Sequence, residues 1–120
     1  MGACYSISAK FKIKDEKKFI GLSNSYIEEK ERLGVRFADK VNRSTFKGIL
    51  ETIFTQQEAQ FKKTGELYQY HSDFDTCYSW ESIMYDFLIA VAPSLKDNSS
   101  LYISLDNDEY TLIVQGGNVA

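Results

Sequence analysis

The stretch YSISAKFKI, residues 5–13, decides the fold, because its hydrophobic side chains fall on every second residue. Successive side chains of a β-strand point to opposite faces, so this alternation predicts a strand with one buried face and one basic face. The buried face would hold Tyr5, Ile7, Ala9, Phe11 and Ile13, and the other face Ser6, Ser8, Lys10, Lys12 and Lys14. The strand is therefore expected in a sheet that is covered on one side.

Three segments have the spacing of apolar residues that is typical of amphipathic helices. The first helix is expected to begin after Asp15 and end at Gly34, the second to begin after Ser44, and the third to run from Ser79 to the residue before Pro93. Their apolar stripes are, in chain order, Phe19, Leu22, Tyr26, Ile27 and Leu33; then Phe46, Ile49, Leu50, Ile53 and Phe54; then Trp80, Ile83, Met84, Phe87, Leu88 and Val91.

The remaining segments predict extended structure. Residues 35–38 form at most a short extended piece, and a turn at 63–65 predicts a central hairpin whose arms contain Ala59 and Phe61, then Tyr68, Tyr70, Ser72 and Phe74. A second helix that continues to Lys63 is the alternative for residues 56–63. A C-terminal hairpin with its turn at residues 107–108 would pair Leu105 with Tyr110, Ile103 with Leu112 and Leu101 with Val114 on one apolar face.

This order of elements predicts a single α+β domain over residues 1–120, with an antiparallel or mixed sheet and about three helices packed on it. The sheet would contain the N-terminal strand and both hairpins. With 120 residues and 43% hydrophobic residues, the chain is long enough for one core. It has no apolar run long enough for a membrane helix and no secretory leader pattern, so we expect a cytoplasmic protein with no membrane partner.

Charge divides unevenly along the chain. Residues 1–57 carry 11 Lys and Arg against 7 Asp and Glu, whereas residues 58–120 carry 3 against 10. Because opposite potentials steer association, an acidic C-terminal half favours a partner protein with a basic surface. Tyrosines accompany these acids, and aromatic side chains anchor interfaces. The partner-binding residues predicted on this basis are Asp73, Asp75, Tyr78, Glu81, Tyr85 and Asp86.

Enzymatic chemistry is the alternative interpretation of the same acids. Asp73 and Asp75 would lie on one side of a strand and, with Glu81 and His71, could line a small-ligand or hydrolase pocket. Helix-start chemistry explains Glu81 equally well, since carboxylates stabilise the positive end of a helix. The sequence contains no P-loop, GxGxxG, GxSxG or HExxH motif, and we predict no catalytic residue and no cofactor.

Other reactive residues favour structural roles. Cys4 and Cys77 are expected as unpaired thiols, and a dyad of Cys77 with His71 is disfavoured because nearby acids destabilise a thiolate. Residues 106–109 are acidic, but Gly117 stands where a calcium loop needs its bidentate Glu, so a hairpin turn is expected and no metal site. The lysines of the first strand, followed by Lys17 and Lys18, are expected to be a solvated face, and direct nucleic-acid binding is not expected from an acidic chain.

Three segments together carry a family resemblance: Met1–Cys4 leading into a strand, Phe74–Ser82 (FDTCYSWES), and Ala90–Pro93 leading to residues 97–99 and a hairpin. With these features the chain resembles small uncharacterised proteins carried by phages and mobile elements of Gram-positive bacteria. The resemblance spans nearly the whole chain and supplies no catalytic motif. It implies an inhibitor of host defence, such as an anti-CRISPR-like protein, whose partner would be a nucleic-acid-binding defence protein.

Overall fold

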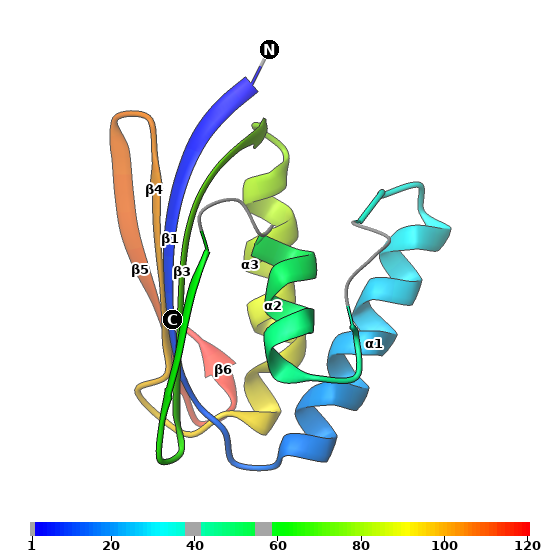
Figure 1. Ribbon diagram of the computed structural model, residues 1–120, viewed down its shortest axis with the longest axis vertical. Helices are drawn as coiled ribbons and strands as arrows, with labels where there is room; N and C mark the ends of the chain where they lie inside the picture. Colours follow the sequence, from blue (N-terminus) through cyan, green and yellow to red (C-terminus); the bar gives the residue numbers. More distant parts are fainter. Residues whose placement is uncertain (1, 38–41, 55–58) are drawn as a thin grey trace.

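The computed structural model describes residues 2–37, 42–54 and 59–120. Within these residues the chain forms an antiparallel sheet of six strands in the order β2-β3-β1-β4-β5-β6. The strands are β1 (Gly2–Lys12), β2 (Gln60–Thr64), β3 (Leu67–Cys77), β4 (Ser100–Leu105), β5 (Asp108–Gln115) and β6 (Asn118–Val119). Helices α1 (Glu16–Arg32), α2 (Phe46–Phe54) and α3 (Trp80–Val91), and the 3-10 turn η1 (Ala92–Ser94), lie on one side of the sheet (Figure 1). The predicted α+β fold is confirmed.

Strand β1 is the centre of the sheet. It pairs with β3 from Gly2 to Lys12 and with β4 from Tyr5 to Lys10, so that each hairpin attaches to one of its edges. The predicted alternation is confirmed, and the strand begins three residues earlier than expected. Its buried side chains are Ala3, Tyr5, Ile7, Ala9 and Phe11.

Helix α1 begins as predicted, because Asp15 accepts a hydrogen bond from the Lys18 backbone N–H at 3.1 Å. Its N-terminal half reaches the sheet, where the Phe19 ring packs on those of Phe11 and Phe46 with centroids 6.4 and 4.9 Å away. Its C-terminal half lies on the outer side of α3 (Figure 1). Leu33 was expected in the apolar stripe, but it is 71% exposed because the helix has already ended at Arg32.

Helix α2 begins one residue later than predicted. Its capping side chain is Thr45, not Ser44, since Thr45 Oγ1 accepts the Gly48 backbone N–H at 3.1 Å. Gly48 itself permits a close approach, because a Cβ atom there would overlap the backbone carbonyl of Asn42. The remaining apolar side chains of α2 are buried as predicted: Phe46, Ile49, Leu50, Ile53 and Phe54.

The central hairpin is formed by β2 and β3, which confirms strand for residues 60–63 over the helical alternative. Residues 56–58 of the disputed segment lie outside the described residues. The extended piece predicted at 35–38 is not a strand at residues 35–37, and Ala38 lies outside the described residues. The Phe37 ring instead packs on Trp80 with centroids 5.6 Å apart.

The C-terminal hairpin has a different register from the predicted one. Its two-residue turn is Asp106-Asn107, so Ile103 pairs with Tyr110 and Leu101 with Leu112, a shift of two residues. Asp106 takes the turn position with a φ of 52°, a left-handed conformation that Asp tolerates through local hydrogen bonding. Since side chains alternate with a period of two, the predicted apolar residues still face inward.

Helix α3 follows its predicted stripe and ends where η1 begins at Ala92. Ser79 holds the N-cap position, but its side chain makes no capping hydrogen bond; its hydroxyl lies 3.1 Å from the Cys77 sulfur. Phe87 is the central ring of the helical layer and contacts Phe19, Tyr26 and Phe54 edge-on. These rings make the core between sheet and helices.

Candidate functional site

The second face of the sheet carries no helix or strand from the described residues (Figure 1). We call it the open face. Strand register places its side chains in rows that cross the sheet: Cys4 with Asp75; Ser6 with Asp73, Ser104 and Glu109; Ser8 with His71, Tyr102, Gln60 and Thr111; Lys10 with Gln69, Ser100, Lys62 and Ile113; Lys12 with Leu67 and Thr64. The fold therefore assembles one polar surface from five strands.

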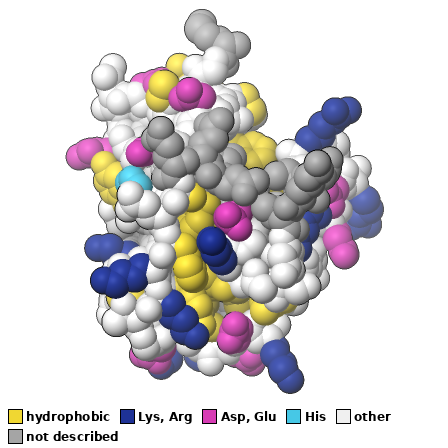
Figure 2. Space-filling view, in the orientation of Figure 1, with side chains coloured by type: hydrophobic (Ala, Val, Ile, Leu, Met, Phe, Trp, Pro, Cys, Tyr) yellow, Lys and Arg dark blue, Asp and Glu magenta, His cyan; other side chains and the backbone are white. Residues whose placement is uncertain are grey.

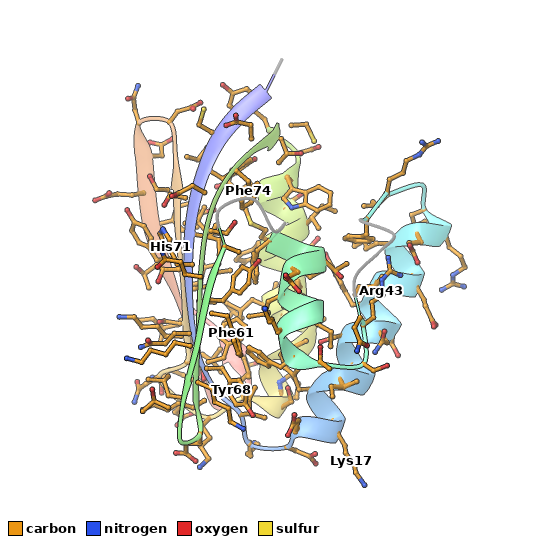
Figure 3. The ribbon with its side chains drawn as sticks, in the orientation of Figure 1. Lys17, Arg43, Phe61, Tyr68, His71 and Phe74 are labelled. Atoms are coloured by element: carbon orange, nitrogen blue, oxygen red, sulfur yellow. The ribbon has the colours of Figure 1, made fainter. Side chains whose placement is uncertain are left out.

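Charge on the open face is sorted by sign. Among the side chains of these rows, the carboxylates lie in the rows of Cys4 and Ser6, and the lysines lie in the rows of Lys10 and Lys12. Beyond the rows, Glu66 and Asp97 lie beside Lys12, in a pocket that Lys14 and Lys96 also line. His71 lies in the row between them. Along the left edge of Figure 2, acidic side chains gather above the histidine and lysines lie directly below it. Figure 3 shows His71 pointing away from the helices.

The acidic end of this face is hollowed. Six of the residues around the hollow are Cys4 and Ser6 of β1, Asp73 and Asp75 of β3, Ser104 of β4, and Asp106 of the following turn, and its volume is about 810 Å³. We call this feature the acidic hollow. No Lys or Arg in the described part of the chain forms an ion pair with its three carboxylates. Their charge is available to an incoming cation.

The pKa values of two side chains at the acidic hollow reflect this negative charge. Cys4 is exposed, and its pKa is raised because its thiol hydrogen-bonds Asp75 and the nearby negative charge of Asp75 disfavours the thiolate. Tyr78 donates its hydroxyl to Asp106 at 2.8 Å, and this hydrogen bond and the Asp106 charge raise its pKa. Both shifts have the sign expected for a negative potential.

Tyrosines surround the acids at this end. Tyr78 is 50% exposed, and Tyr102 donates its hydroxyl to Glu109 at 2.9 Å. A tyrosine held by a carboxylate keeps its ring in a defined orientation on the surface. Rings of this kind offer contact area at a small cost in side-chain entropy.

The six predicted partner-binding residues divide between two sides of the molecule. Asp73, Asp75 and Tyr78 come together at the acidic hollow. Glu81 does not join them, because its carboxylate accepts the hydroxyl of Tyr110 from the inner side of β5. Glu81 belongs to a helix, whereas Asp73 and Asp75 belong to a strand in which every second side chain shares a face. Glu81 therefore points in a different direction from the two aspartates.

The other two predicted residues lie on the helical side. Asp86 faces α1 and pairs with Lys30 at 3.7 Å, and Tyr85 is a 38% exposed residue of α3. The prediction grouped them with Asp73 because they are near in sequence. Neither residue lines the acidic hollow.

Sequence reasoning missed Asp106, Glu109 and Tyr102 as members of this surface. The sequence predicts a hairpin turn for both acids, which is correct for Asp106, whereas Glu109 lies in β5. Asp106 lies near Asp75, and Glu109 shares a row with Asp73, through the pairing of β1 with β3 and β4 and of β4 with β5. No local signal reports that pairing. The backbone N–H of Asp106 donates to the Cys4 carbonyl at 3.4 Å, which ties the turn to β1.

The alternative site chemistries find little support in the described residues. His71 and Cys77 are six residues apart on β3, about 20 Å along the strand, which is too far for a dyad. His71 lies 3.6 Å from Asp73 through Nε2. Cys4 and Cys77 are both free thiols, and no three His, Cys, Asp or Glu side chains in these parts of the chain are arranged to hold a metal ion.

No helix of the described segments has both the length and the apolarity needed to cross a bilayer. Comparison with models of known protein families, with curated proteins and with solved structures found no match for this chain.

Proposed function

We propose that this chain is a non-enzymatic protein-binding module whose acidic hollow receives a basic surface of a partner protein. The observation that carries the proposal is the convergence of Asp73, Asp75 and Asp106 around one hollow without a Lys or Arg ion pair from the described residues. Three carboxylates around one hollow give it a negative potential that favours a cation. Arg and Lys of a partner provide that cation.

A protein partner accounts for the surroundings of the hollow better than a small ligand does. The Tyr78 ring lies beside it with half of its surface exposed, as expected of an interface anchor. The ligand-binding or hydrolase alternative needs Glu81 beside Asp73 and Asp75, yet Glu81 is bonded to Tyr110 and does not line the hollow. That alternative loses one of its three carboxylates.

The family resemblance of the sequence supports a narrower form of this proposal. The partner would be a nucleic-acid-binding defence protein of the host, and the chain would be an anti-CRISPR-like inhibitor carried by a mobile element. Surfaces that bind nucleic acid are rich in Lys and Arg, because they neutralise phosphates. The carboxylates of the acidic hollow would then bind the Lys and Arg side chains of the partner that otherwise bind phosphates.

The test compares two double variants that each remove two negative charges. Asp73→Asn with Asp75→Asn changes the hollow, and Glu28→Gln with Glu29→Gln changes exposed positions of α1. Immobilised wild-type protein captures partners from a Gram-positive bacterial lysate, and the association rate of an identified partner is measured at low and high salt.

The hollow variant should lower the association rate at low salt by about tenfold and flatten its salt dependence, because charges at an interface mainly steer encounter. The α1 variant should behave as the wild type. Tyr78→Ala should weaken the complex by about 2 kcal/mol, as expected for an aromatic anchor. An association rate that is equal in both double variants would contradict the proposal.

A further inference from the structure

The open face carries charge of both signs, and its two ends have complementary layouts. The Ser8 row is the midline: the Ser6 and Lys10 rows lie two residues to either side of it, and the Cys4 and Lys12 rows lie four. At about 3.4 Å per residue, the outermost rows are each about 14 Å from the midline. Reversal of the strand direction therefore exchanges the acidic rows for the basic rows.

We infer that the open face docks on the open face of a second copy of this chain. The two copies would be related by a two-fold axis that runs along the Ser8 row, between the two stacked sheets. Such an axis turns one face toward the other and reverses its strands, so each acidic row meets a basic row. Contacts made by a two-fold axis occur twice, which doubles the complementarity.

The same symmetry places a specific side chain over the acidic hollow. Rotation about this axis places each residue of β1 above β1 of the second copy. The acidic hollow is centred on β1, between Asp75 of β3 and Asp106 beside β4. The β1 residue that meets the Cys4 row is Lys12, and the one that meets the Ser6 row is Lys10. Each acidic hollow then receives the Lys12 ammonium of the other copy.

Side-chain size and charge on the face permit this contact. The three central rows, those of Ser6, Ser8 and Lys10, include Ser6, Ser8, Ser100 and Ser104 on β1 and β4, whose short side chains allow two sheets to approach to about 10 Å. Within the described residues neither Lys10 nor Lys12 forms an ion pair, so no internal contact has to break. The lysines also extend from the face beyond the serines and can enter a facing hollow.

This inference uses the acidic hollow but does not rest on the proposed function. The second copy and a basic partner would occupy the same carboxylates, so self-association competes with partner binding. Lysine variants separate the two, because the lysines belong to the self-contact alone.

Charge reversal tests the pairing directly by sedimentation equilibrium at low salt. Lys10→Glu with Lys12→Glu makes both ends of the face acidic, and Asp73→Lys with Asp75→Lys cancels the net negative charge of the acidic end, where Asp106 and Glu109 remain. Each variant alone should self-associate at least about tenfold more weakly than the wild type, and an equimolar mixture should form a one-to-one heterodimer. Lys17→Glu with Lys18→Glu makes the same charge change on α1 and should leave self-association unaltered.

A thiol crosslink tests the geometry. Position 12 is about 27 Å from Cys4 along β1, whereas in the stacked sheets it lies about 10 Å from Cys4 of the other copy, which is too far for a direct disulfide. In a Cys77→Ser background, a short bis-maleimide should therefore join Lys12→Cys to Cys4 of the other copy as a covalent dimer. The same reagent should not join Lys17→Cys, on the helical side, to Cys4 of the other copy.

A wild-type protein that remains monomeric at millimolar concentration and low salt would overturn the inference. So would a mixture of the reversed variants that stays monomeric, or a Lys12→Cys protein that the bis-maleimide does not join into a covalent dimer. The proposed function fails separately, if partner association is indifferent to Asp73→Asn with Asp75→Asn. Circular dichroism of each variant checks that a loss of association is not a loss of folding.

Discussion

The two faces of the sheet are made by the same strands but follow different rules. On the inner face of β1 every second side chain is buried beneath helices, and the set is aliphatic or aromatic. On the open face the intervening side chains are mostly polar, and the charged ones in its rows are separated by sign along the strands. The side chains of the inner face must be apolar because they are buried. The side chains of the open face are not buried beneath helices, so their arrangement by charge can serve recognition.

The largest effect should come from the inner layer. Phe87→Ala removes a fully buried ring that contacts three others, and large-to-small changes of this kind cost about 3–5 kcal/mol. Tyr102→Ala, on the open face, should change the free energy of unfolding by less than about 0.5 kcal/mol. Urea denaturation of both variants measures the contrast. Similar midpoints for the two would mean that the faces do not differ as described.

A smaller effect should follow from a methyl group added to the helical layer. Gly48→Ala places a Cβ atom against the Asn42 carbonyl and should destabilise the protein by about 1–3 kcal/mol, the usual cost of overpacking. Gly21→Ala is the matched change in α1, where a Cβ meets no atom within 4 Å, and it should stabilise by up to about 1 kcal/mol. Thermal unfolding of the pair gives opposite shifts. A Gly48→Ala variant with unchanged thermal stability would show that the loop before α2 moves to accommodate the added methyl group.

The smallest effect probes the charge of the open face. The pKa of Cys77 is lowered, mainly by its hydrogen bond with Ser79, whereas that of Cys4 is raised by Asp75. Because the thiolate is the reactive form, iodoacetamide should modify Cys77 faster than Cys4, and the increase of the rate with pH should occur at a lower pH for Cys77 than for Cys4. Asp75→Asn should bring the two rates closer.

Peptide mass spectrometry of dilute protein follows both thiols, and Ser79→Ala should slow Cys77 without changing Cys4. Equal rates for Cys4 in the wild type and in Asp75→Asn would argue against a negative potential in the acidic hollow.

Local patterns predicted the inner face well. The alternation of β1, the stripe of α3 and the Asp15 cap each depend on neighbours within one turn or a few residues of strand, and all three are confirmed. The errors occurred where neighbouring residues allow two answers. The C-terminal hairpin accepts either of two registers that keep its apolar face, and the left-handed Asp106 decides between them.

The candidate site could be predicted in part only. Asp73 and Asp75 share a side of one strand, so their proximity was predictable. Asp106 joins them through pairings between residues about 70 to 100 positions apart, which sequence spacing does not encode. Glu81 and Asp86 were misplaced because a helix follows the strand and turns their side chains away.

The position of β1 has a consequence for how the chain is made. Of the six strands of this sheet it is synthesised first, yet both of its neighbours, β3 and β4, are synthesised after residue 66. Until then β1, with its alternating apolar side chains, has no neighbouring strand and can pair with another nascent chain. Lys10 and Lys12 interrupt its hydrophobic sequence and discourage that pairing. Such distant pairings also slow folding, so this protein should reach its native state late, after synthesis of β4 is complete.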